Sequence, residues 1–115
     1  MQTFRTRILT PEKCVFDEEV DALVVPGPAG SFGVLARHAP MIAAVGAGIL
    51  KVSGEAGTRF IAVSNGLLQA GENAVLLLAD SAIPASDEYD AEEKLAVVIA
   101  EAAPRGYGRA QTPAA

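Results

Sequence analysis

Apolar and polar residues alternate at the start of the chain. Phe4, Thr6 and Ile8 fall on one side of an extended segment, and Arg5 and Arg7 fall on the other. A period of two residues is the pattern of a β-strand with one buried face. We therefore expect the chain to open with a strand that lies on a hydrophobic core.

Four further segments have the length and composition of strands. In residues 20–25, apolar side chains fall on both sides, which predicts a strand buried on much of both faces. Residues 49–53 alternate again, and residues 60–63 and 74–79 are short runs rich in branched apolar side chains. All of these runs are of strand length.

Turn-forming residues separate the runs at the spacing typical of an all-β fold. Residues 26–30 read Pro-Gly-Pro-Ala-Gly and end one strand. Residues 54–57 and 70–73 predict two hairpins. About ten short strands fit in residues 1–83, which predicts a flattened antiparallel β-sandwich.

The pattern changes at Pro84, which is expected to break the strand pattern. Ser86 and Asp87 are favoured residues at a helix N-cap, and the acidic residues that follow suit the first turns because the helix dipole favours negative charge there. Apolar residues then recur on one helix face, at Ala91, Leu95, Val98 and Ala102. This apolar face must dock on the sandwich or on a partner, since a lone helix of about 17 residues is marginal in water.

The predicted helix stops at Pro104, and the Gly-, Pro- and Ala-rich residues 105–115 are predicted to be disordered. The chain thus divides into a β-sandwich domain, residues 1–83, and a short C-terminal segment, residues 84–115. The predicted fold class is mainly β, with a single C-terminal α-helix and a disordered tail.

Composition and charge exclude some partners. Half of the residues are hydrophobic, which is enough for a core, and the net charge is −5 with scattered cations. Because phosphate backbones would repel this charge, we expect no nucleic-acid partner. No apolar stretch approaches the roughly 20 residues that span a bilayer, so we expect no direct membrane insertion.

The single cysteine, Cys14, cannot form an internal disulfide. Together with the lack of a signal-peptide pattern, this predicts a reducing, cytosolic setting. We interpret Cys14 as a small core residue rather than a reactive thiol.

Candidate catalytic chemistry is sparse. His38 is the only histidine, and it lacks the partners that catalysis or a metal site requires. We expect no catalytic residue, no metal and no cofactor, and we leave open whether His38 has an interface role or a structural one.

Two other motifs have plain structural interpretations. Gly27, Gly30 and Gly33 lack the Lys-Ser/Thr of a phosphate loop, so we expect them to supply positive φ or a close backbone approach. The acidic run is interpreted as a solvated turn entering a strand; it comprises Asp17, Glu18, Glu19 and Asp21.

Residues 25–40 carry a resemblance to a known family. They read Val-Pro-Gly-Pro-Ala-Gly-Ser-Phe-Gly-Val-Leu-Ala-Arg-His-Ala-Pro. This resembles the signature of F-type ATP synthase ε subunits, in which Gly-x-x-Gly-x-(Leu/Phe)-Gly and His-(Ala/Thr)-Pro recur at this spacing. Three further stretches agree with the family in order: residues 9–16, 48–52, and 60–66 followed by 75–82.

The resemblance covers about residues 4 to 83 and implies a ten-stranded β-sandwich that is not catalytic. It implies a rotor subunit of the central stalk that links the γ subunit to the c-ring, couples ion translocation to ATP synthesis, and is peripheral at the cytoplasmic face of the bacterial inner membrane. It also implies a contact of the C-terminal helix with the α and β subunits.

The resemblance suggests contact residues. Those expected to face the c-ring are Ala29, Gly30, Ser31, Phe32, Arg37, His38 and Ala39. Many family members carry Glu where this chain has Ser31, which would remove a charged contact. Those expected to face the γ subunit are Met41, Ile42, Val45, Glu72 and Asn73.

The C-terminal segment departs from the family pattern. Typical members carry two helices that can extend and block ATP hydrolysis, and some bind ATP through Ile/Leu-Asp-x-x-Arg-Ala. Here Asp90 is kept, but Glu93 and Lys94 replace Arg-Ala. Because Glu93 would repel phosphate, we expect no tight ATP binding. Because the helical region is truncated to one predicted helix, we expect its inhibition of ATP hydrolysis to be weak or absent.

Two other classes of function compete with this interpretation. One is a free-standing β-sandwich that binds a small ligand at residues 27–33, but the sequence lacks clustered aromatic or polar groups for a pocket. The other is a small hydrolase built on His38, which lacks partners.

Overall fold

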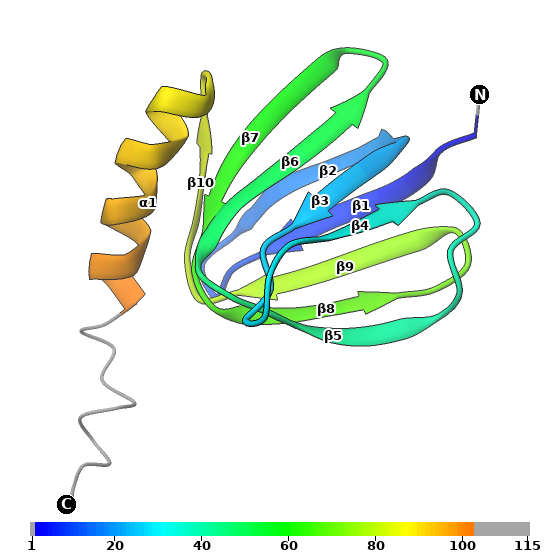
Figure 1. The fold of residues 1–115 in the computed structure, drawn as a ribbon, viewed down its shortest axis with the longest axis horizontal. Coiled ribbons are helices and arrows are strands. Elements are labelled where there is room, and N and C mark those ends of the chain that lie inside the picture. The colour runs from blue at the N-terminus through cyan, green and yellow to red at the C-terminus, as the bar shows by residue number, and fades with distance from the viewer. Residues whose placement is uncertain (1, 103–115) are drawn as a thin grey trace, which may run out of the picture.

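The computed structural model describes residues 2–102, which form ten strands in two sheets and one helix (Figure 1). Sheet A contains, in spatial order, β2 (Cys14–Val20), β1 (Phe4–Leu9), β9 (Ala74–Ala79), β8 (Gly66–Ala70) and β5 (Met41–Val45). Sheet B contains β10 (Ala82–Ala85), β7 (Gly57–Val63), β6 (Gly48–Gly54), β3 (Ala22–Val25) and β4 (Phe32–Leu35). The helix is α1 (Glu88–Ala102).

The predicted fold class is confirmed as a mainly β sandwich followed by one helix. The predicted hairpins at residues 54–57 and 70–73 join β6 to β7 and β8 to β9. The predicted stop at Pro104 and the predicted disordered tail, residues 105–115, lie outside the described residues.

The core lies between the inner faces of the two sheets. On β1 the predicted side is buried, with Phe4 and Ile8 no more than 1% exposed, and on β6 Leu50 and Val52 are fully buried. These side chains meet others from both sheets in one continuous cluster, which includes Leu77 of β9. The alternation of apolar and polar residues thus correctly predicted which sides of β1 and β6 face the core between the two sheets.

Pairing between neighbouring strands is antiparallel in the described sheets with one exception. β1 lies between β2 and β9 and runs parallel to β9, with Arg7 beside Leu76. A parallel pair cannot be joined by a short turn, and here the intervening chain contains the seven strands from β2 to β8. The sequence pattern gave no signal for this pair.

The prediction of one strand over residues 20–25, buried on both faces, is wrong. β2 ends at Val20 and β3 begins at Ala22, with Asp21 as a single bend residue between them. The chain passes from sheet A to sheet B at this bend, so Val20 and Leu23 both point into the core, while Val24 is 39% exposed. The change of sheet shifts the alternation by one residue.

The expected break at Pro84 is also wrong, because β10 continues through Pro84 to Ala85. β10 pairs only with β7 and is therefore an edge strand. A proline is tolerated there because it lacks only a backbone donor that no further strand would use.

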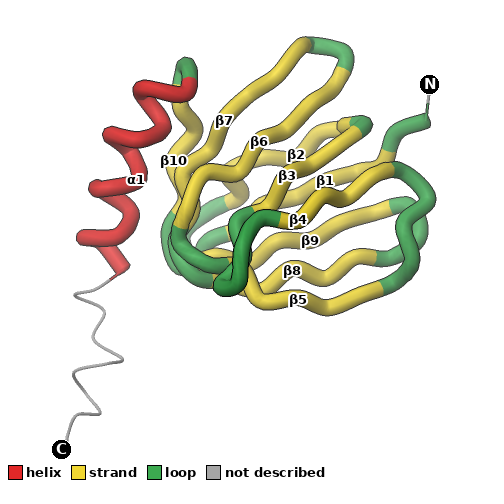
Figure 2. Tube along the Cα trace, in the orientation of Figure 1, coloured by secondary structure: helices red, strands yellow, loops and turns green. Residues whose placement is uncertain are grey.

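The helix forms a third layer on the outer face of sheet B, against β10 and β7 (Figure 2). Its start is capped as predicted at Asp87, whose Oδ1 accepts a hydrogen bond from the Asp90 amide at 2.8 Å. Ala91 and Val98 are fully buried, which confirms the predicted apolar face and shows that it docks on the sandwich.

Thr6 is an exception in the core and leads to a prediction. Its side chain is fully buried, and its hydroxyl has no hydrogen-bond partner among the described residues. A buried unpaired hydroxyl is unfavourable, so Thr6→Val should raise the free energy of unfolding by about 1–2 kcal/mol in urea titrations. Thr58→Val, at an exposed strand position, is the control and should change it by less than about 0.5 kcal/mol. A loss of stability in Thr6→Val would mean that the hydroxyl is satisfied by a buried water.

Candidate interaction surfaces

The glycine-rich connection between β3 and β4 is a tight, exposed loop. The amides of Gly27 and Gly30 each donate to the other's carbonyl oxygen at 3.2 Å. Gly30 has a φ of 131°, and a Cβ on Gly27 would lie 2.8 Å from the Gly30 carbonyl oxygen. The predicted reasons for these two glycines are confirmed. The loop exposes Ala29, Gly30 and Ser31, while Phe32 is half-buried.

The connection between β4 and β5, residues 36–40, is a second projecting loop. Arg37 and Ala39 are exposed, and His38 is half-buried between them. The His38 Nδ1 lies 2.7 Å from the Leu35 carbonyl oxygen, and its ring meets the Phe4 ring edge-on at 5.2 Å between centroids. These contacts support a structural role for His38.

The structure separates the residues predicted to face the c-ring. The first loop precedes β4 and the second follows it, so they project from opposite ends of the sandwich (Figure 1). The Gly46 amide donates to the Pro26 carbonyl oxygen, which places the first loop beside the β5–β6 connection. At the other end, Met41 pairs with Ala70, which places the second loop beside the β8–β9 turn.

The two loops therefore do not form one continuous surface, and their contact with the c-ring stays a prediction. The two segments are neighbours in sequence, but the four residues of β4 lie between them and span roughly 13 Å as a strand. Arg37, His38 and Ala39 instead lie at the same end as Glu72 and Asn73, which were predicted to face a different partner.

The residues predicted to face the γ subunit have mixed exposure. Ile42 is 71% exposed, and Glu72 and Asn73 are exposed in the β8–β9 turn. Met41 packs partly against the core, and Val45 is only 2% exposed. Val45 is therefore a core residue, and its selection as a contact was wrong.

The outer face of sheet A carries apolar side chains that sequence reasoning missed. Leu67 of β8 and Leu78 of β9 are directly paired, and both are more than 40% exposed. Ala44 of β5 pairs with Leu67 and brings the row beside Ile42. The signal in the sequence was that Leu67 and Leu78 adjoin Leu68 and Leu77, so alternation places one leucine of each pair outside.

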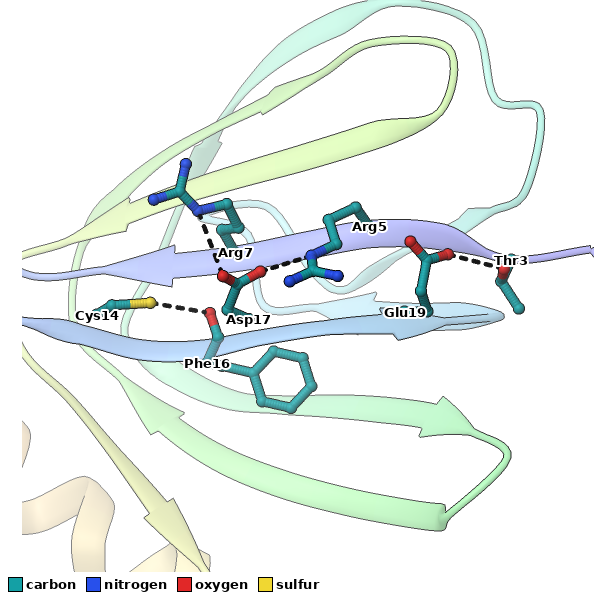
Figure 3. A network of polar contacts seen from close by, with 7 residues as sticks. All are labelled: Thr3, Arg5, Arg7, Cys14, Phe16, Asp17 and Glu19. Atoms are coloured by element: carbon teal, nitrogen blue, oxygen red, sulfur yellow. Dashed lines mark hydrogen bonds and ion pairs between the residues drawn. The ribbon is translucent and has the colours of Figure 1, made fainter.

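Charged side chains on β1 and β2 continue this outer face (Figure 3). The Arg5 Nε lies 2.6 Å from the Asp17 carboxylate, with Arg7 4.0 Å from the other oxygen, and the Thr3 hydroxyl donates to Glu19. Asp17, Glu18 and Glu19 belong to strand β2. Their interpretation as a turn is wrong because they lie within this strand, although all three are exposed. Arg5 of β1, in the same sheet, pairs with Asp17, whereas Arg59 of β7, in the other sheet, pairs with Glu18.

Glu18 instead joins the two sheets. The Arg59 guanidinium from β7 donates to both oxygens of the Glu18 carboxylate, once at 2.9 Å, and also lies 5.0 Å from the centroid of the Phe16 ring. A bidentate pair of this kind has a fixed geometry. It closes the edge of the sandwich where β2 faces β7.

The acid pairs give a pH prediction. Hydrogen bonds from Arg5, Arg59 and Lys94 lower the pKa of Asp17, Glu18 and Asp90 respectively. Protons therefore bind these carboxylates more readily in the unfolded chain than in the folded one. The stabilisation from the three ion pairs is fully present above the unfolded pKa values of about 4, and it is lost as pH falls through the lower pKa values of the folded chain. Urea midpoints should be level above about pH 5 and decrease below about pH 4. A double variant, Asp17→Asn with Glu18→Gln, should show a shallower decrease, and an unchanged slope would contradict the assignment.

Cys14 is exposed at the start of β2, so its interpretation as a core residue is wrong. Ile8 pairs with Phe16 but Leu9 pairs with Cys14, which leaves Val15 as an extra residue in the strand. This irregularity interrupts the alternation, and Cys14 does not continue the inward side set by Phe16.

The segment that resembles an ATP-binding motif is occupied by local contacts. Asp90 accepts hydrogen bonds from the Ser86 amide at 2.9 Å and from the Lys94 ammonium at 2.7 Å. Glu93 is exposed on the next turn. The two side chains that could approach a phosphate are thus the Glu93 carboxylate and the Lys94 ammonium, which is already paired with Asp90.

Other kinds of site are absent from the described residues. Within residues 2–102, no cluster of three or more His, Cys, Asp or Glu side chains is arranged to bind a metal. No helix in that part of the chain has the length and apolarity needed to cross a membrane. The features that remain are two projecting ends and an apolar outer sheet face.

The chain is similar in sequence to ATP synthase epsilon chains. The family described as ATP synthase, Delta/Epsilon chain, beta-sandwich domain matches residues 3–85. The ATP synthase epsilon chain of Rhodopseudomonas palustris (strain TIE-1) is 40% identical over 87 residues, which cover 76% of this chain and 64% of that protein. The ATP synthase epsilon chain of Desulforamulus reducens is 42% identical over 93 residues, covering 79% and 68%. The chain therefore spans less than two thirds of the first of these relatives.

Two solved structures share the fold. A chain of the Euglena gracilis mitochondrial ATP synthase (OSCP/F1/c-ring) matches with a TM-score of 0.69 and 22% identity, covering 99% of this chain and 69% of that one. A chain of the Tetrahymena thermophila mitochondrial ATP synthase (central stalk/c-ring) matches with a TM-score of 0.61 and 11% identity, covering 85% and 92%. At these identities the likeness establishes the β-sandwich.

Proposed function

The chain belongs to the ATP synthase ε-chain family, and from this membership we propose that it is a non-catalytic subunit of the rotor that links the γ subunit to the membrane c-ring. Such a link needs two separate contact surfaces on one rigid body. The observation that supports it is the separation of the two projecting loops at opposite ends of the sandwich, on a core that is continuous between them.

We assign the apolar outer face of sheet A, with its adjoining end, to the γ subunit. Ile42, Leu67 and Leu78 supply exposed apolar area there, and large exposed apolar side chains in one patch are typical of protein interfaces. Arg37, Glu72 and Asn73 lie at the end of the sandwich that borders this face. A mixture of apolar centre and polar rim is the usual composition of such a surface.

We assign the opposite end to the c-ring. Its loop exposes Ala29, Gly30 and Ser31, and the two hydrogen bonds between Gly27 and Gly30 hold it in one shape. A small loop that is held by backbone hydrogen bonds and exposes the Ser31 hydroxyl suits contact with the polar loops of a membrane rotor. The chain would then be peripheral at the cytoplasmic face of the membrane, held there by its partners.

We further propose that residues 1–83 act as the coupling domain and that residues 84–115 add little regulation. Described polar groups of the ATP-like segment already bond one another, so ATP should bind with a Kd above about 100 µM, as measured by calorimetry. Tighter binding would contradict this. A contact of α1 with the α and β subunits is part of the same proposal, and Tyr89 is 85% exposed on that helix.

Binding of the purified chain to the matching γ subunit tests the function. We expect a one-to-one complex by size exclusion and calorimetry. If folded γ shows no binding at tens of micromolar, a range that would detect even weak complexes, the stalk assignment fails. A free-standing ligand-binding sandwich would then be the better explanation.

A further inference from the structure

Arg37 has an unusual backbone conformation. Its φ is 62°, and it is the one non-glycine residue with positive φ in residues 2–102. The left-handed region is unfavourable for residues with a Cβ, so neighbouring contacts must hold the backbone there. Arg37 is nevertheless an exposed, charged residue at the tip of the β4–β5 loop.

His38 provides those contacts. The carbonyl oxygen of Leu35 can only accept, so the His38 Nδ1 carries the proton of the 2.7 Å hydrogen bond that closes the turn around Arg37. The imidazole packs edge-on against Phe4, which is 1% exposed, and this ties the turn to the core. The His38 Nε2 is itself buried, so the polar atoms of this ring are directed into the protein rather than towards a partner.

We propose that His38 is a positioning residue, which fixes the backbone of Arg37 so that its guanidinium meets a carboxylate or carbonyl group of the γ subunit. This rests on the proposed function. A guanidinium held in place loses less freedom on binding, and charge-assisted hydrogen bonds are the strongest that such a surface offers. Arg37 is then the contact residue, and His38 acts through it.

A double-mutant cycle against purified γ subunit tests the proposal. In calorimetric titrations, Arg37→Ala and His38→Phe should each weaken binding about tenfold, because Phe keeps the ring but loses the Nδ1 donor. Binding by the double variant should also be weakened only about tenfold relative to wild type, since His38 has nothing to position once Arg37 is gone. His38→Asn, whose amide places a donor near Nδ1, should bind within about threefold of wild type.

Two results would overturn the proposal. One is a double variant weakened about a hundredfold, which would mean that His38 contacts γ independently. The other is His38→Phe binding as wild type does. A urea midpoint for each variant checks that the sandwich is folded.

Amide hydrogen exchange on the free chain separates this inference from the proposed function. His38→Phe should speed exchange at residues 36–39 about tenfold, whereas Arg37→Ala should not. If the wild-type chain fails to bind γ, the stalk assignment fails, while unchanged exchange in His38→Phe would show separately that His38 does not fix the turn.

Discussion

Replacing Gly66 with alanine is expected to lower the free energy of unfolding by about 3–5 kcal/mol. Gly66 opens β8 and pairs with Ala79 of β9. A Cβ at this position would lie 2.0 Å from the Leu78 carbonyl oxygen and 2.9 Å from the Ala79 Cα. Both atoms belong to the backbone of β9, so the clash cannot be relieved by turning a side chain. The two strands would have to separate, in a domain whose whole stability is about 5–15 kcal/mol.

Gly71→Ala is the matched control for this variant, since Gly71 directly follows the other end of the same strand. A Cβ there meets nothing closer than the Ala74 carbonyl oxygen at 3.9 Å, and its φ lies outside the left-handed region. Gly71→Ala should therefore change stability by less than about 1 kcal/mol in the same urea titrations. Similar losses for both variants would mean that general strand flexibility, and not the contact with β9, determines the effect.

The sequence predicts the strands whose two faces differ in polarity. β1 was predicted correctly because its arginines mark the outer side, and β6 because Lys51 and Ser53 do the same. β5 carries Met-Ile-Ala-Ala-Val and has no polar residue to mark a side. Its alternation therefore could not show that Val45 points inward and Ile42 outward.

The positions where the chain passes from one sheet to the other were the second feature that the sequence did not predict. The single bend at Asp21 moves the chain from one sheet to the other. The acidic run predicted a turn near this position, but no Gly or Pro marks the bend, and nothing in the run indicates a change of sheet. The same reasoning applies to the signature in residues 25–40, which reads as one continuous motif. Because β4 passes through the middle of it, its two halves lie at opposite ends of the sandwich, and only the three-dimensional structure shows this separation.

Replacing Ile42 with aspartate is expected to weaken binding to the γ subunit at least thirtyfold, or about 2 kcal/mol. Ile42 is 71% exposed, more than any other large apolar side chain of the described strands, and it borders the row that includes Leu67. A carboxylate buried at the centre of an apolar interface would lose its hydration without gaining a partner. Calorimetric titration with purified γ measures the change directly.

Val24→Asp provides the comparison, because Val24 is an exposed apolar strand residue on the outer face of sheet B. Both substitutions put an acid on a strand of a protein that is already negatively charged, so any general effect of charge or of strand propensity should be shared. We expect Val24→Asp to bind γ within about threefold of wild type, with urea midpoints that remain similar for the two variants. If Val24→Asp weakens binding as much as Ile42→Asp, the outer face of sheet A is not the γ surface. The interface would then have to include sheet B, where α1 already covers β10 and β7.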